Sequence, residues 1–251
     1  MPSKTPKRPG STDTQQTYEA YKDQQVPQVL IKQTNWEELN FYRKSDVVYQ
    51  LTTAFCRRFL PRYGDRTVDQ MVQAARSGKQ NFVEGLADGV TSTEMQMKLL
   101  NVARSSLQEL QQDFEDYLKS RHLKFWGLPP KLKDGETRTI PESYYDGNTA
   151  RYDAMLNYCR THNTLEEYEP LFKQWNDEEL CNYALTLCHM IDRMMMSFLE
   201  KLETEFVTEG GIKERMYKAR TGFRSQQDER LKQLEAERPV IEKQLADAQA
   251  E

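Results

Sequence analysis

Residues 74–85 read AARSGKQNFVEG and lie in the middle of a segment, residues 46–120, that decides the fold. In this segment apolar side chains recur every three or four residues in three successive runs, which is the period of one face of an α-helix. The connections between the runs are only a few residues long, so consecutive helices must fold back on each other as antiparallel neighbours. The segment therefore predicts an array of helical hairpins.

Four long helices are expected, at residues 46–60, 66–85, 92–121 and 176–207, with ends set by capping residues and helix breakers. The expected N-caps are Ser45 or Asp46 for the first helix, Thr67 for the second, Thr91 or Ser92 for the third, and Asn176 paired with Glu179 for the fourth. Four amphipathic helices of this length predict an all-α fold, specifically an antiparallel up-down four-helix bundle.

Three regions are expected along the chain. Residues 1–30 are rich in Pro, Thr, Gln and Lys without an apolar period, which predicts a flexible basic and polar arm. Residues 31–207 form the bundle, interrupted at 124–175 by an insertion with short helices at 150–159 and 169–175, where Pro170 suits a first turn. Residues 208–251 form a basic suffix and a helical tail, which Arg238 and Pro239 interrupt. Its sparse apolar residues leave two interpretations open, a short self-associating helix and a solvated tail.

The composition is typical of a soluble, strongly helical protein, because 37% of the 251 residues are hydrophobic and 29% are charged. The chain has four cysteines, no apolar run of membrane length and no hydrophobic leader after Met1. We therefore expect a cytoplasmic protein with reduced thiols and no membrane partner.

A first basic cluster falls on the end of the first helix, the following loop and the second helix. Its six cations, opposed only by Asp65 and Asp69, leave a net charge of +4 over residues 57–79. The cations are Arg57, Arg58, Arg62, Arg66, Arg76 and Lys79. If the two helices are antiparallel, most of these groups gather near one end or edge of the bundle, where they could neutralise phosphates. The alternative is a solvated face of ion pairs.

A second basic cluster follows Gly211 and also carries a net charge of +4, from five cations and Glu214. The cations are Lys213, Arg215, Lys218, Arg220 and Arg224. Tyr217 and Phe223 lie between them, and aromatic rings between cations can stack on unpaired bases. The same apolar side chains could instead dock the segment on its own or a neighbouring bundle.

The remaining polar candidates are interpreted as structural. Asn81 and Glu84 share a helix face and could bond across to the first or third helix, and Gly85 could adopt a left-handed helix cap. Neither histidine nor a second carboxylate accompanies them, so we expect no catalytic role and no enzyme activity. Cys181 and Cys188 fall seven residues apart on the apolar stripe and are expected to be core thiols, which leaves neither a metal site nor a cofactor site.

The chain resembles the bacterial four-helix-bundle proteins named after the intervening sequences of large-subunit ribosomal RNA genes. The resemblance covers residues 45–121 and, less sharply, 176–207. It rests on Ala74, Ala75, Ser77, Asn81, Glu84, Gly85, Ser92, Ser106, Leu107, Glu109 and Leu110. Residues 180–224, above all EGGIKER at 209–215, are similar to the suffix variant of this family, which has an extra C-terminal block.

The resemblance implies a partner and an assembly. The family includes the accessory variability-determinant proteins of diversity-generating retroelements, which form ring-like homopentamers and bind nucleic acid beside a reverse transcriptase. The expected function is a non-enzymatic, oligomeric accessory protein that binds RNA or DNA. An oligomeric scaffold that binds a protein through its tail is the alternative. Apolar positions beyond the needs of one bundle also favour an oligomer, among them Met97, Leu100, Val102 and Met190.

Overall fold

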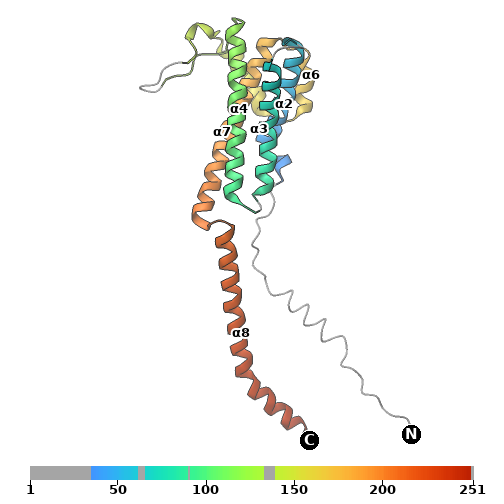
Figure 1. Ribbon diagram of the computed structural model, residues 1–251, viewed down its shortest axis with the longest axis vertical. Helices are drawn as coiled ribbons and strands as arrows, with labels where there is room; N and C mark the ends of the chain where they lie inside the picture. The colour runs from blue at the N-terminus through green and yellow to red at the C-terminus, as the bar shows by residue number, and fades with distance from the viewer. Residues whose placement is uncertain (1–34, 62–65, 90, 133–138, 250–251) are drawn as a thin grey trace, which may run out of the picture. The chain divides into compact units, whose positions relative to one another are not determined.

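The computed structural model describes residues 35–61, 66–89, 91–132 and 139–249 (Figure 1). Side chains are described up to residue 239. The expected N-terminal arm, residues 1–30, lies outside the described residues, as do Arg62 and residues 133–138 of the expected insertion. The chain separates into two compact units, and residues 31–212 form the larger one.

Helices are the regular secondary structure of the described residues, which confirms the all-α fold class. The elements are η1 (Trp36–Glu38), α2 (Asn40–Phe59), α3 (Arg66–Asp88), α4 (Thr93–Ser120), η2 (Glu142–Tyr144), α5 (Thr149–Thr161), α6 (Leu165–Phe172), α7 (Asp177–Glu209) and α8 (Ile212–Gln249). In this part of the chain, β pairing is limited to an isolated parallel bridge between Phe125 and Tyr145.

Four helices surround the core of the larger unit. α2 contacts α3 and α7, and α4 contacts the same two helices. Aromatic rings from different helices meet between them, with the Phe55 ring centroid 5.1 Å from that of Phe114 and 4.8 Å from that of Tyr117. Burial of such large apolar side chains is the dominant favourable term in folding, so these contacts hold the four helices together.

The N-terminus of α2 differs from the sequence prediction. The helix begins at Asn40, and Ser45 and Asp46 lie inside it instead of capping it. Ser45 is buried, and its hydroxyl donates to the Tyr42 carbonyl at 2.6 Å. Phe41 explains the extra turn, because its ring packs between those of Phe82 and Phe198, at 5.5 and 5.6 Å. The buried stripe of α2 thus starts before the expected cap.

The caps of α4 and α7 are as predicted. The Ser92 hydroxyl accepts from the Met95 amide at 3.2 Å, and Asn176 exchanges hydrogen bonds of 2.9 and 2.8 Å with Glu179 in a capping box. Each bond satisfies an amide that the first turn of a helix leaves without a partner.

Gly85 does not end α3, which continues to Asp88 in ordinary helical conformation. A Cβ atom on Gly85 would lie 3.2 Å from the Leu99 Cβ and 3.3 Å from the Gln96 carbonyl oxygen of α4. On Gly78 it would lie 3.0 Å from the Leu107 side chain. The prediction of a left-handed cap at Gly85 was wrong, and the glycines instead permit close approach of α3 and α4.

The segment between α4 and α7 contains turns and two short helices, as expected, but the second helix begins earlier. Thr164 and Glu167 form a capping box that starts α6 at Leu165. Pro170 therefore lies in the helix interior, not in the first turn. The sequence prediction missed the threonine-glutamate pair, which is a recognisable start signal.

The helix α8 belongs to the smaller unit except for its first residue. It continues through Pro239, where an interruption was expected. Most of its described side chains are exposed, among them Leu231 and Leu234, whose exposed fractions are 56% and 52%.

Candidate nucleic-acid interface

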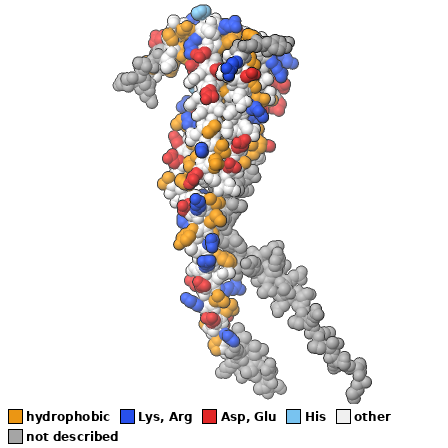
Figure 2. Space-filling model, viewed as in Figure 1, with side chains coloured by type: hydrophobic (Ala, Val, Ile, Leu, Met, Phe, Trp, Pro, Cys, Tyr) orange, Lys and Arg blue, Asp and Glu red, His pale blue; other side chains and the backbone are white. Residues whose placement is uncertain are grey.

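The cations of the first basic cluster do not form one patch. Arg57 and Arg58 lie in the last turn of α2, and Arg66 begins α3. Arg76 and Lys79 follow ten and thirteen residues later, which places them roughly 15 and 20 Å further along α3. Figure 2 shows basic and acidic side chains interspersed over the visible face of the larger unit. Of the five described cations, three therefore lie at the end of α2 or the start of α3, whereas Arg76 and Lys79 lie in the second half of α3.

Lys79 is paired with Asp46, a contact that the sequence analysis did not predict. Its ammonium group forms a salt bridge with Asp46 of α2 and lies 5.9 and 5.6 Å from the ring centroids of Tyr42 and Tyr49. Burial raises the pKa of Tyr42, while the nearby Lys79 lowers it. Lys79 therefore joins α2 to α3 and is not a free phosphate ligand.

Arg58 is also partly engaged. Its guanidinium donates to the Phe172 carbonyl at the end of α6 and lies 4.6 Å from the centroid of the Phe59 ring. A cation at a helix C-terminus satisfies carbonyls that have no partner in the helix and interacts favourably with the helix dipole. This contact positions α6 against α2.

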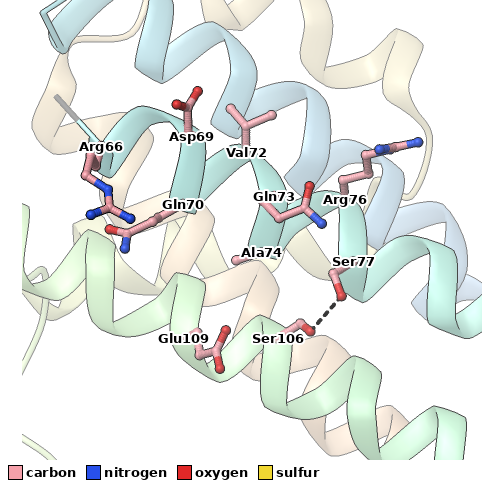
Figure 3. Close-up of a pocket in the computed structure, with 10 residues that line it drawn as sticks. All are labelled: Arg66, Asp69, Gln70, Val72, Gln73, Ala74, Arg76, Ser77, Ser106 and Glu109. Carbon is pink, nitrogen blue, oxygen red and sulfur yellow. Dashed lines mark hydrogen bonds between the residues drawn. The ribbon is translucent and has the colours of Figure 1, made fainter. Parts of the chain in front are cut away.

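Arg66 and Arg76 border a hollow of about 760 Å³ between α3 and α4 (Figure 3). Asp69 and Glu109 line the same hollow, so its formal charge is balanced. Figure 3 also shows that the Arg76 side chain extends away from α4. This arrangement provides little attraction for phosphate groups.

Ser77 connects α3 to α4, and Asn81 holds Ser77 from within α3. The Asn81 amide donates to the Ser77 carbonyl at 2.9 Å and to its hydroxyl at 3.2 Å, and the Ser77 hydroxyl lies 3.0 Å from that of Ser106. Asn81 thus bonds within its own helix, and Ser77 makes the bridge to α4 that was expected of Asn81. Glu84 is exposed and accepts from Gln80 at 3.3 Å.

The second basic cluster divides between two sides of α8. A helix turns about 100° per residue, so Lys213, Tyr217, Arg220 and Arg224 fall within about 60° of one another. We call these four residues the basic stripe. With Met216 and Thr221 they line a shallow hollow of about 430 Å³. Arg215 and Lys218 point well away from the stripe on the same geometry, so the cluster predicted from sequence is only partly brought together.

The hollow beside the basic stripe is lined by apolar as well as basic side chains. The exposed fraction of Tyr217 is 70% and that of Met216 is 48%. Figure 2 shows apolar and basic side chains following each other along the first half of α8. The lining of the hollow contains no acidic side chain among its described members.

The cysteines are core residues, as expected for Cys181 and Cys188. All four thiols are buried. Burial raises the pKa of Cys188 to about 12, which keeps this thiol protonated near neutral pH. Within the described ranges, no three or more His, Cys, Asp or Glu side chains converge as metal ligands would.

The sequence prediction missed a buried lysine. Lys44 is 2% exposed, and its ammonium group donates to the carbonyls of Cys159 and His162, the latter at 2.8 Å. Tyr168 donates its hydroxyl to the same His162 carbonyl at 3.2 Å. Burial is the main cause that lowers the pKa of Lys44. The position of Lys44, three residues from Phe41 and from Val47, already placed it on the apolar stripe of α2.

Comparison with protein-family models, curated proteins and solved structures finds no match to this chain. Function must therefore be argued from the residues and their geometry. Among the described helices, none combines the length and apolar character needed to cross a lipid bilayer.

Proposed function

We propose that this protein is a non-enzymatic nucleic-acid-binding accessory protein that contacts RNA or DNA through the basic stripe of α8. The observation that carries the proposal is the presence of three cations on one helix face, Lys213, Arg220 and Arg224, around a hollow lined by no described acid. Lys and Arg side chains that neutralise phosphates supply most of the sequence-independent affinity for nucleic acids.

The basic stripe supports this function better than the first basic cluster does. Lys79 and Arg58 are engaged with Asp46 and with the Phe172 carbonyl, and two acids offset Arg66 and Arg76 in their hollow. A cation that already has a partner must give up that contact before it can bind a phosphate. This reduces the net binding free energy that the new contact contributes.

The proposal includes an assembly. We propose that α2, α3, α4 and α7 form an antiparallel up-down bundle and that several copies associate, as a homopentamer by the resemblance, beside a reverse transcriptase. Exposed Met95, Val102 and Met196 provide apolar surface for such contacts. Leu100, one of the residues on which the oligomer was argued, is fully buried and belongs to the core. A solution mass measurement tests the number of copies.

The test of the function is binding of the full chain to labelled RNA and DNA as salt concentration varies. Replacing Lys213, Arg220 and Arg224 together by alanine should weaken binding and reduce the slope of log K against log salt by roughly 2 to 3. The matched control replaces Arg57, Arg66 and Arg76 and should have a much smaller effect. If only the control weakens binding, the interface lies on α2 and α3; absence of binding at low salt rejects the function.

A protein scaffold is the second candidate, favoured by exposed Leu231 and Leu234 three residues apart on α8. Under this alternative, deletion of residues 225–251 abolishes association with a protein partner, tested first with a reverse transcriptase. Nucleic-acid affinity then stays unchanged, because the basic stripe ends at Arg224.

A further inference from the structure

Tyr217 is the feature of the basic stripe that phosphate binding does not explain. Its ring is 70% exposed, and its helix positions four after Lys213 and three before Arg220 place it between two cations. Its backbone carbonyl accepts from the Thr221 hydroxyl at 2.9 Å, a bond that leaves the ring accessible. The exposed ring makes no contribution to the core, and its π-face is accessible to a ligand.

The geometry of the stripe limits what that ligand is. From Lys213 to Arg224 the stripe extends roughly 16 Å along the helix axis. Glu214 lies about 100° around the helix from Lys213, and Asp228 lies one turn beyond Arg224. The ligand therefore meets a narrow row of cations with one aromatic ring in the middle.

We propose that the basic stripe selects single-stranded over double-stranded nucleic acid, with Lys213, Arg220 and Arg224 binding phosphates and Tyr217 stacking on an unpaired base. This inference rests on the proposed function and specifies its ligand class. Every base has a π-face, so stacking on one tyrosine gives affinity for a single strand without requiring a particular sequence.

Duplex nucleic acid does not offer Tyr217 the same contact. In a duplex the base faces are covered by their neighbours, and a helix lying in the major groove meets base edges and phosphates. The three cations can still neutralise duplex phosphates, but the ring gains no stacking partner. Tyr217 should thus discriminate between the two forms, whereas the cations contribute to both.

An anionic membrane surface is the other ligand that attracts a basic helix, and the arrangement of the stripe argues against it. A helix that lies on a membrane keeps its apolar side chains on one face and its cations on the opposite face. Here Tyr217 shares a face with the cations, so burying the ring in lipid would bury the charges beside it.

The experiment measures binding of the full chain by fluorescence anisotropy at low salt. The probes are an unstructured RNA of about 20 nucleotides, the corresponding DNA, and the duplex of each. Tyr217→Ala should weaken binding to both single strands by roughly 5- to 150-fold and binding to the duplexes by less than about twofold. Tyr217→Phe keeps the ring and should stay within about twofold of the unmodified chain.

Lys218→Ala is the matched control, since it removes an exposed cation of α8 that lies off the stripe, and its effect should be equally small on all four probes.

Vesicles of phosphatidylserine and phosphatidylcholine form the final arm. Equal losses of single-strand and duplex binding in Tyr217→Ala, or no loss, would overturn the inference while nucleic-acid binding stands. Binding to vesicles that depends on Tyr217, with single-strand binding unaffected, would also overturn it. Failure of the unmodified chain to bind any nucleic acid rejects the proposed function itself.

Discussion

Lys44 shows how one buried charge fixes the position of a short helix. Its ammonium group reaches from α2 to two carbonyls at the C-terminus of α5, where the helix leaves acceptors without intrahelical donors. The cost of burying the cation, seen in its lowered pKa, is offset by these bonds and by the negative end of the helix dipole.

We expect Lys44→Met to lower the free energy of unfolding by about 1–3 kcal/mol, because methionine fills the space but leaves both carbonyls without this donor. Urea unfolding followed by circular dichroism measures the change. Lys98→Met, at an exposed position of α4, is the control and should change stability by less than about 0.5 kcal/mol. If Lys44→Met is as stable as the unmodified chain, the desolvation cost of the ammonium equals the value of its bonds.

At the scale of elements, Gly85 allows α3 and α4 to approach closely. Gly85→Ala places a Cβ near a backbone oxygen and a Cβ of α4, which cannot move aside as the end of a flexible side chain can. We expect a net loss of about 1 kcal/mol in the free energy of unfolding, since overpacking exceeds the gain of about 1 kcal/mol in helix propensity.

Gly222→Ala gives the matched comparison, because apart from its chain neighbours and the adjacent backbone of α8 no atom lies within 4 Å of the added Cβ. It should increase the helical circular dichroism signal of α8 without any loss of stability. A Gly85→Ala variant that is more stable than the unmodified chain would show that α3 and α4 separate at little cost.

The same elements show what the sequence could and could not predict. Apolar periodicity identified α2, α3, α4 and α7, because each helix buries one side over several turns. The polar caps at Ser92 and Asn176 were predicted correctly, but the polar cap formed by Thr164 and Glu167 was overlooked. The start of α2 was predicted wrongly because burial of Phe41 extends the helix. The partner of Lys79 could not be predicted, since Asp46 lies 33 residues away and only the packing of α2 on α3 brings them together.

For the whole molecule, the difference between local patterns and contacts made by packing explains why we propose the basic stripe as the site and not the first basic cluster. Positions on one helix have a relative geometry that the sequence already contains, so the basic stripe of α8 could be recognised from the spacing of its residues. The first basic cluster depended on the alignment of two helices and on partners elsewhere in the fold. In the folded chain Arg58 contacts α6 and Lys79 contacts α2. Local sequence patterns do not predict contacts between residues so far apart in the chain.

The free energy of unfolding of the whole molecule should depend on pH because several titratable groups are buried in the core. Burial raises the pKa of Cys159 to about 11 and those of Cys188 and Tyr183 to about 12, above the ordinary values of 9.0 for cysteine and 10.0 for tyrosine. In the folded chain these groups stay protonated at a pH where the unfolded chain has lost the protons. Their contribution to stability is therefore complete below about pH 9 and decreases as the pH rises towards the folded values.

We expect the free energy of unfolding to fall from about pH 9 upward, by about 1.4 kcal/mol per pH unit for each such group once its unfolded form is ionised. The pKa of Lys44 is lowered from its ordinary value of 10.5, so this group increases stability as the pH rises from its pKa in the folded chain to 10.5. This single group opposes several groups with raised pKa values. Urea midpoints measured under reducing conditions at a series of pH values test this expectation. Cys188→Ala should reduce the fall in stability above pH 9 by about 1.4 kcal/mol per pH unit, which is the contribution of one such group. A stability that stays constant to pH 11 would mean that solvent reaches these side chains and that the core is less tightly closed than their burial indicates.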